Sequence, residues 1–321
     1  MNIKKIGLTA LAASLVSVSA HAGEMTISGA ASVGIGGYSG EKTNRGTSFT
    51  MGNQFTVSGG GELDNGLNVS LSYQLDNAAG ESGPFDDHSI TISSDEIGTI
   101  KFSGHGGSSA TSAMDATAAG DIWDGFDAAG TSSSGVTGVT IGASGGTDNS
   151  VYYTTPSVMD GLTINASYNP QGAGAESELG YGVTYTGVDG LTLKYATMDE
   201  NTGTAGTSGD QTAWRVEYAL GPVTATVTNN DYDMGTATND KETSSYNVSY
   251  TVSDEMSISY GTEEIDLGSG TVDAEYSAFV VSYTAGGMTL TGKVEEGKNV
   301  DGTTDSDADV DYYFLGAAFA F

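Results

Sequence analysis

Carboxylate side chains occur along a long glycine- and serine-rich stretch, residues 105–148, which separates two regions of alternating apolar and polar residues. Its candidate functional residues are Asp115, Asp121, Asp124 and Asp127. A loop of this length in a compact domain is usually functional or disordered, and carboxylates that line an opening attract cations and repel anions. We therefore favour a loop that lines a narrow opening. The alternative is an external loop that only keeps the protein soluble.

Four of the ten basic residues lie in the middle of alternating stretches. Their immediate neighbours are apolar, as Ile100 and Phe102 are beside Lys101, so a period of two places the charge on the opposite face. These residues are Lys101, Lys194, Arg215 and Lys293, and Glu217 shares its face with Arg215. One interpretation is that they oppose the loop carboxylates across a narrow opening and create a transverse field. The other interpretation is that the strands span a membrane and these side chains only avoid its lipid, because a lysine or arginine that faces lipid at the bilayer midplane costs about 2–4 kcal/mol.

The residues that could support catalysis are few. The chain contains no cysteine, and His88 and His105 belong to no recognisable arrangement of nucleophile and base. We therefore predict that the chain is not an enzyme.

A short phrase centred on tyrosine returns along the second half of the chain. Its tyrosines are Tyr153, Tyr185, Tyr218, Tyr250 and Tyr283, at spacings of 32 or 33 residues. Each is followed by a short turn sequence, such as Asp-Gly or Gly-Gly, and then by a new alternating stretch, which is the pattern of a β-hairpin. Alternation predicts about sixteen strands, near 24–37, 47–61, 66–76, 87–94, 98–104, 149–155, 161–169, 178–187, 190–199, 211–220, 222–232, 242–252, 255–266, 274–285, 287–296 and 309–321.

The connections between these strands alternate strictly in length. Short turns follow the even strands, and longer polar segments follow the odd strands. Each strand also keeps one apolar row, as Leu71 and Tyr73 do against Ser70 and Ser72. Lipid outside and water inside explain this pattern, and closure removes the strand edges that lipid does not tolerate. The predicted fold is an all-β, antiparallel transmembrane β-barrel with short periplasmic turns, long extracellular loops and one long loop folded inward.

The beginning of the chain has the pattern of a secretory signal peptide. Lys4 and Lys5 precede an apolar run that ends at the small-residue motif Ala20–Ala22. We expect a signal peptide over residues 1–22 and the barrel over 23–321, with 105–148 as the constriction loop. The net charge of −31 repels nucleic acid and attracts cations.

The end of the chain, residues 309–321, reads as the closing strand. Tyr313, Leu315, Ala317, Phe319 and Phe321 form its lipid-facing row, and we expect small or polar residues on the opposite row. This strand should pair with the first strand to close the barrel.

The acidic run Asp305–Asp311 has some likeness to a calcium loop. An EF-hand needs glycine at its sixth position and glutamate at its twelfth, where this run has Val310 and Gly316. We therefore expect no specific metal site and no cofactor. The default is that divalent cations are loosely held, with bridging to lipopolysaccharide phosphates as one use for them.

Taken together, these features resemble the general porins of alphaproteobacteria over nearly the whole chain. The resemblance is carried by the ordered stretches "GEMTISGAASVGIGGY", "SSDEIGTIKFSG", "DNSVYYTTP" and "YYFLGAAFAF". It implies a sixteen-stranded homotrimer in the bacterial outer membrane, with a water-filled pore narrowed by the loop after the fifth strand. It also implies that Tyr313, Phe319 and Phe321 form the signature by which the barrel-insertion machinery receives such chains.

The resemblance implies passive passage of small hydrophilic solutes. Family members typically line one wall of the constriction with arginines, whereas residues 23–321 contain only Arg45 and Arg215. We therefore expect a general diffusion porin that prefers cations. The alternatives are a substrate-selective outer-membrane channel and an exported acidic structural or adhesive β protein.

Overall fold

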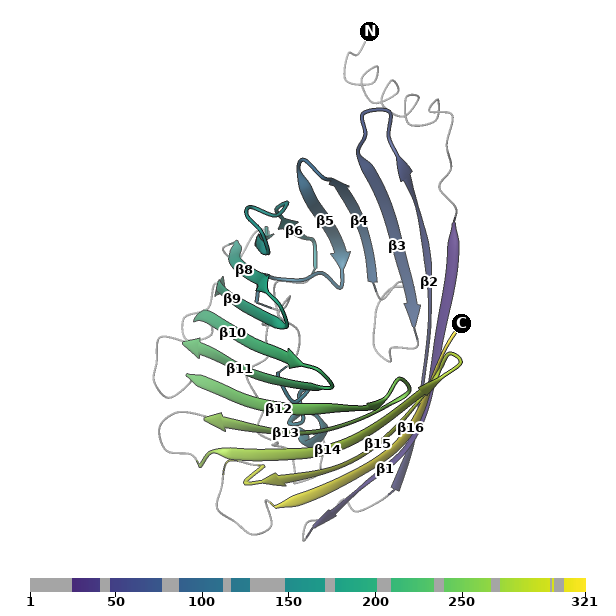
Figure 1. Cartoon of the computed structure of the whole chain (residues 1–321), viewed down its shortest axis with the longest axis vertical. Helices are drawn as coiled ribbons and strands as arrows, with labels where there is room; N and C mark the ends of the chain where they lie inside the picture. Colours follow the sequence, from purple (N-terminus) through teal and green to yellow (C-terminus); the bar gives the residue numbers. More distant parts are fainter. Residues whose placement is uncertain are drawn as a thin grey trace.

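Sixteen antiparallel strands form one closed barrel in the computed structural model of the chain (Figure 1). The structure describes residues 25–40, 47–76, 87–111, 117–127, 148–170, 177–200, 209–233, 240–266, 272–300, 302 and 309–321. The predicted signal peptide, 1–22, lies outside the described residues. Within these ranges, no helix is long and apolar enough to cross a membrane.

The strands agree closely with the predicted ranges. They are β1 (Thr26–Gly40), β2 (Thr47–Glu62), β3 (Asn68–Asp76), β4 (Asp87–Ser94), β5 (Gly98–His105), β6 (Ser150–Thr154), β7 (Leu162–Asn169), β8 (Glu178–Val188), β9 (Leu191–Glu200), β10 (Gly209–Leu220), β11 (Val223–Asp233), β12 (Lys241–Ser253), β13 (Met256–Asp266), β14 (Ala274–Ala285), β15 (Met288–Lys298) and β16 (Val310–Ala320). β1 extends beyond its predicted end because Gly40 still pairs with Val310 on the neighbouring strand.

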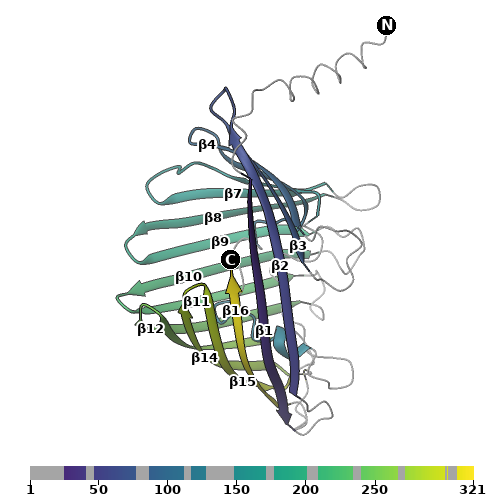
Figure 2. The ribbon, with the colours of Figure 1, turned by 90° about the vertical axis from the view of Figure 1, so that its right-hand side faces the viewer.

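One rim of the barrel is formed by short turns, as the sequence predicts. Even-numbered strands such as β8, β10 and β14 turn directly into the next strand there, and Figure 2 shows hairpins of this kind together on one side of the barrel. Gly190 and Gly287 occupy two of these turns with φ of 72° and 80°, a conformation that glycine adopts without steric cost. The glycine residues in these turns therefore allow the tight backbone conformation at this rim.

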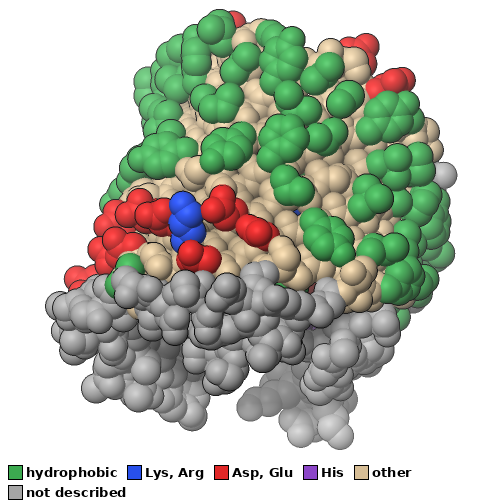
Figure 3. Space-filling view, turned by 90° about the horizontal axis from the view of Figure 1, so that it is seen from below, with side chains coloured by type: hydrophobic (Ala, Val, Ile, Leu, Met, Phe, Trp, Pro, Cys, Tyr) green, Lys and Arg blue, Asp and Glu red, His purple; other side chains and the backbone are tan. Residues whose placement is uncertain are grey.

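The outer surface is apolar around the middle of the barrel and charged near the rim of the long loops (Figure 3). Tyr246 and Val248 are 58% and 53% exposed on the outer face of β12. Farther along the neighbouring strands, the exposed outward side chains become Glu264, Glu275 and Glu296. A lipid-facing belt bordered by a charged band is what a spanning barrel requires.

The barrel closes between its first and last strands. Ala30 pairs with Ala320 in the antiparallel register of β1 and β16. Beyond them, the N–H of Gly29 donates to the carbonyl of Phe321 at 2.7 Å, and the N–H of Phe321 donates back at 3.0 Å. The last residue of the chain therefore completes the seam.

The inward row of β16 differs from the expectation of small or polar residues. Tyr312 and Phe314 lie on this row, since they alternate with the exposed Tyr313 and Leu315. Space for Tyr312 comes from a glycine of β1, because a Cβ added at Gly36 would come within 2.5 Å of its hydroxyl. Aromatic rings therefore line the lumen here.

Candidate functional site

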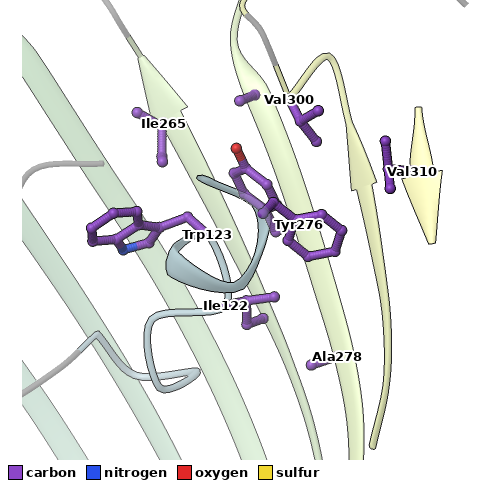
Figure 4. Packing of buried hydrophobic residues seen from close by; sticks show 9 residues of the cluster. Ile122, Trp123, Ile265, Tyr276, Ala278, Val300 and Val310 are labelled. Atoms are coloured by element: carbon purple, nitrogen blue, oxygen red, sulfur yellow. The ribbon is translucent and has the colours of Figure 1, made fainter. Parts of the chain in front are cut away.

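The largest buried apolar cluster lies inside the barrel, between the long loop and the wall. The short helix α2 (Asp124–Asp127) and the turn before it supply Ile122, Trp123 and Phe126 to this cluster. The wall supplies Ile265, Ala274, Tyr276, Ala278, Val300 and Val310. Figure 4 shows the loop side chains resting among these wall residues. The prediction of an inward-folded loop is thus confirmed for the part of the loop that the structure describes.

Phe126 is the centre of this attachment, with 1% of its surface exposed. Its ring centroid lies 5.3 Å from that of Tyr276 and 6.3 Å from that of Tyr38. The hydroxyl of Tyr38 also donates a hydrogen bond to the carbonyl of Gly125. The helix is therefore held on one side by β14 and on the other by β1.

The segment before α2 is fastened to the wall by hydrogen bonds between loop backbone and wall side chains. The N–H of Ala118 donates to the hydroxyl of Thr228 at 2.9 Å, and the N–H of Ala119 donates to Ser245 at 2.9 Å. The amide nitrogen of Asn247 donates to the carbonyl of Ala118 at 2.9 Å. These contacts satisfy backbone groups that would otherwise lack partners in a buried segment.

Glu263 on β13 is the buried carboxylate at the middle of this attachment, and it is 2% exposed. One oxygen accepts a hydrogen bond from the hydroxyl of Thr117, and the other accepts from the N–H of Trp123 at 3.1 Å. A buried carboxylate is tolerated only when such donors surround it. Glu263 therefore closes the loop segment 117–123 onto the wall.

The first described part of the loop contacts strands β7 and β10, on a part of the inner wall away from α2. The N–H of Ala110 donates to Ser167 on β7 at 2.9 Å, and the hydroxyl of Thr111 donates to Gln211 on β10 at 2.9 Å. The described loop therefore runs along the inner face from β7 to β16 and reaches β1. At the start of the loop, His105 lies 3.9 Å from the carboxylate of Asp87 on β4.

The predicted loop carboxylates are placed differently from one another. The carboxylate of Asp121 accepts from the N–H of Thr117 at 3.1 Å and stabilises the loop turn while half exposed. Asp124 is exposed at the start of α2. The backbone of Asp127 ends this helix, while its side chain and the whole of Asp115 lie outside the described residues.

The predicted basic residues lie on the inward rows, and two of them are paired with acids. The guanidinium of Arg215 lies 3.2 Å from the carboxylate of Glu217, and Lys194 is the direct register partner of Arg215 on β9. The ammonium of Lys293 lies 2.8 Å from Glu295. The remaining one, Lys101, is next to the inward Tyr152 of β6 and alternates with the exposed Phe102.

Comparison with known families agrees with this architecture. A profile of Gram-negative porins matches residues 7–321. The chain belongs to the Gram-negative porin family. It is therefore a β-barrel channel of the bacterial outer membrane and not an enzyme, and the alternative of an adhesive or structural exported protein is wrong.

Two solved porins and one other solved outer-membrane protein share the fold of this porin at low sequence identity. A mutant of the Rh. blastica porin has a TM-score of 0.64 and 17% identity over 93% of this chain and 100% of that chain. An anion-selective porin from Comamonas acidovorans gives a TM-score of 0.67 and 15% identity over 93% and 99%. OmpT of Vibrio cholerae without loop L8 gives 0.64 and 18% over the same shares. No curated protein shows a significant sequence match.

Several residues that hold the inward-folded loop of this porin were not predicted from its sequence. Glu263 and Glu295 face inward while their neighbours Glu264 and Glu296 are exposed outside. Side chains of a strand alternate between its two faces. Counting by twos from the outward Tyr260 therefore places Glu264 on the outer face and Glu263 on the inner face. Sequence alone contains no signal that one glutamate of each pair is buried under the loop.

The Arg215–Glu217 pair leads to a test of lumenal charge. Replacing Glu217 by glutamine removes the acid beside Arg215 and Lys194, so the porin should become less favourable to cations. A unit charge about 7 Å from the ion path contributes roughly 0.6 kcal/mol in water, with opposite sign for a cation and an anion, which corresponds to about a sevenfold change in the cation-to-anion permeability ratio. Reversal potentials in a salt gradient measure this ratio.

The matched control for this test is Glu264→Gln, which removes one carboxylate from the exposed outer face. That variant should keep the wild-type reversal potential. Equal reversal potentials for the wild type and Glu217→Gln would show that this charge is too far from the ion path to matter.

Proposed function

We propose that this porin is a general diffusion channel that prefers cations. It passes small hydrophilic solutes without a chemical step. The observation that carries the cation preference is the state of the lumenal bases: Arg215 and Lys293 are each paired with a carboxylate, while Asp124 remains exposed on the loop. Paired bases offer little attraction to anions, whereas an exposed carboxylate in a water-filled pore attracts cations.

The overall charge supports the same conclusion. The net charge of −31 makes the approach to either mouth favourable for cations and unfavourable for anions. The opposing-field hypothesis takes a modified form in this proposal. Because Arg215 and Lys293 are paired with acids, Lys101 and Lys194 are the predicted basic residues left to oppose the loop carboxylates.

A planar bilayer with a tenfold gradient of potassium chloride tests the proposal. The reversal potential should have the sign of cation preference, and its magnitude should fall as the salt concentration on both sides is raised, because salt screens the lumenal charges. A reversal potential of the opposite sign would overturn the proposal.

The partners of the porin form part of the same proposal. Three copies assemble through their apolar outer faces into a homotrimer, outer-membrane lipid surrounds the trimer, and lipopolysaccharide meets the charged band. Divalent cations are loosely held there and no resident cofactor is needed. Tyr313, Phe319 and Phe321 present the terminal signature to the barrel-insertion machinery.

A further inference from the structure

Phe314 on β16 is an aromatic residue on the lumenal face that the constriction loop does not explain. Its neighbour Tyr312 packs against the loop-bound cluster, and so does Tyr38. Phe314 is not among the residues that contact this cluster, although it lies on the same inward row and is only half buried. An apolar ring partly exposed to a water-filled lumen has a free-energy cost, so its presence calls for a specific reason.

Two glycines shape the wall under this ring. Gly34 of β1 and Gly316 of β16 are register partners, and a Cβ added to either would overlap the far edge of the Phe314 ring. The ring therefore lies along the wall over this pair of glycines and does not project across the pore. Because the glycines leave room for it, the ring forms part of a smooth surface.

Polar groups border the ring on two sides. The ammonium of Lys293 lies 5.8 Å from the centroid of Phe314 and 5.2 Å from that of Tyr312. On the other side, the hydroxyl of Thr50 lies 3.0 Å from the Cβ position at Gly34. A fixed aromatic surface with an ammonium over its face and a hydroxyl near one edge has the composition of a small-molecule site, which is mostly apolar with a few placed polar groups.

The charge around the ring selects an uncharged ligand. Lys293 is neutralised by Glu295 at 2.8 Å. On the inward row of β2 beside the ring, Thr50 and Gln54 are uncharged, and the carboxylate that lies nearest along this wall is Asp76 of β3, the register partner of Gln54. A solute that matches this wall needs one apolar face and many hydroxyl groups.

We propose that Phe314, Lys293 and Thr50 form a binding subsite for the pyranose ring of an uncharged sugar. The C–H face of the sugar lies on the aromatic ring, and its hydroxyl groups bond to the ammonium and to the threonine. Binding at this site is weak, because passage requires that the solute enter favourably and still leave. This inference rests on the proposed function, since it assigns a preferred solute class to the same diffusion pore.

Ion-current block by maltotriose tests the subsite. Wild-type pores in planar bilayers should show a concentration-dependent reduction of current beyond that caused by a polyethylene glycol of equal hydrodynamic size. Phe314→Leu keeps the apolar bulk and removes the flat ring. It should raise the half-blocking concentration about three- to tenfold, which is the range expected for an aromatic contact. Lys293→Met should weaken the block as well.

The control is Tyr152→Leu, which alters an inward aromatic residue that is also next to a lysine, but on β6. Maltotriose should reduce the ion current through this variant at the same half-blocking concentration as in the wild type. The inference is overturned if maltotriose acts no more strongly than the polymer, if Phe314→Leu leaves the block unchanged, or if free tryptophan blocks as strongly as the sugar. Ion conductance in salt alone reports the proposed function separately, since the Tyr152→Leu control should retain it and absence of conductance in the wild type would count against the diffusion pore.

Discussion

A porin with Phe126→Ala and Glu263→Gln should have a detached constriction loop and a wider pore. Phe126 is 1% exposed, and truncating a ring buried to this extent costs about 3–5 kcal/mol. Weakening the two hydrogen bonds that Glu263 accepts from Thr117 and Trp123 adds about 1–2 kcal/mol. A total loss of about 4–7 kcal/mol shifts the ratio of attached to detached loop by about a thousandfold or more.

The measurement combines single-channel conductance with the swelling of proteoliposomes in sugars of increasing size. The double variant should conduct more current and admit larger sugars, while the heat-modifiable gel mobility of the barrel stays the same, because the sixteen strands keep their pairing. Glu264→Gln is the control, since this neighbour lies on the outer face. An unchanged size limit in the double variant would show that the attached loop does not set the width of the passage.

Deleting Phe321 should strongly reduce the amount of porin that reaches the outer membrane. The deletion removes both backbone partners of Gly29 at the closing seam. Each unsatisfied backbone group that faces hydrocarbon costs several kcal/mol. The deletion also removes a side chain that is 80% exposed on the outer surface. Quantitative immunoblots of outer-membrane fractions measure the result.

Phe321→Ala separates the two contributions, because alanine keeps the backbone hydrogen bonds and loses only the ring. If the ring is the insertion signature, this variant should fail almost as severely as the deletion. Wild-type insertion of Phe321→Ala, together with failure of the deletion, would restrict the role of this residue to the seam. Pores that do insert from either variant should conduct normally, since neither change touches the lumen.

The barrel itself was predictable from the sequence because each strand meets lipid on one side and water on the other. The alternation around Tyr246 and Val248 therefore indicates that one face of the strand meets lipid. A short Gly-containing turn depends only on the residues of the turn itself. The same alternation predicted the inward direction of Lys101, Arg215 and Lys293. These features depend on residues close together in the chain.

The wall partners of the loop were not predictable because they are distant from it in the sequence. Thr117 and Glu263 are 146 residues apart, and Tyr38 and Gly125 are 87 apart. Nothing near Phe126 in the sequence indicates that its partners lie on β14 and β1. The aromatic inward row of β16 was missed for the same reason, because the space for Phe314 comes from Gly34 on another strand.

The sharp change on the outer surface from Tyr260 to Glu264, within one strand, also determines how deeply the porin lies in its membrane. Residues of a strand advance by about 3.3 Å each, so a shift of the barrel by two residues would bring a row of carboxylates into the hydrocarbon. The tyrosines at the other rim, such as Tyr218 and Tyr250, oppose movement in the reverse direction because their hydroxyl groups belong at the interface. Vertical position is therefore fixed from both sides, and membranes of different hydrocarbon thickness must adapt to this protein by local thinning or thickening.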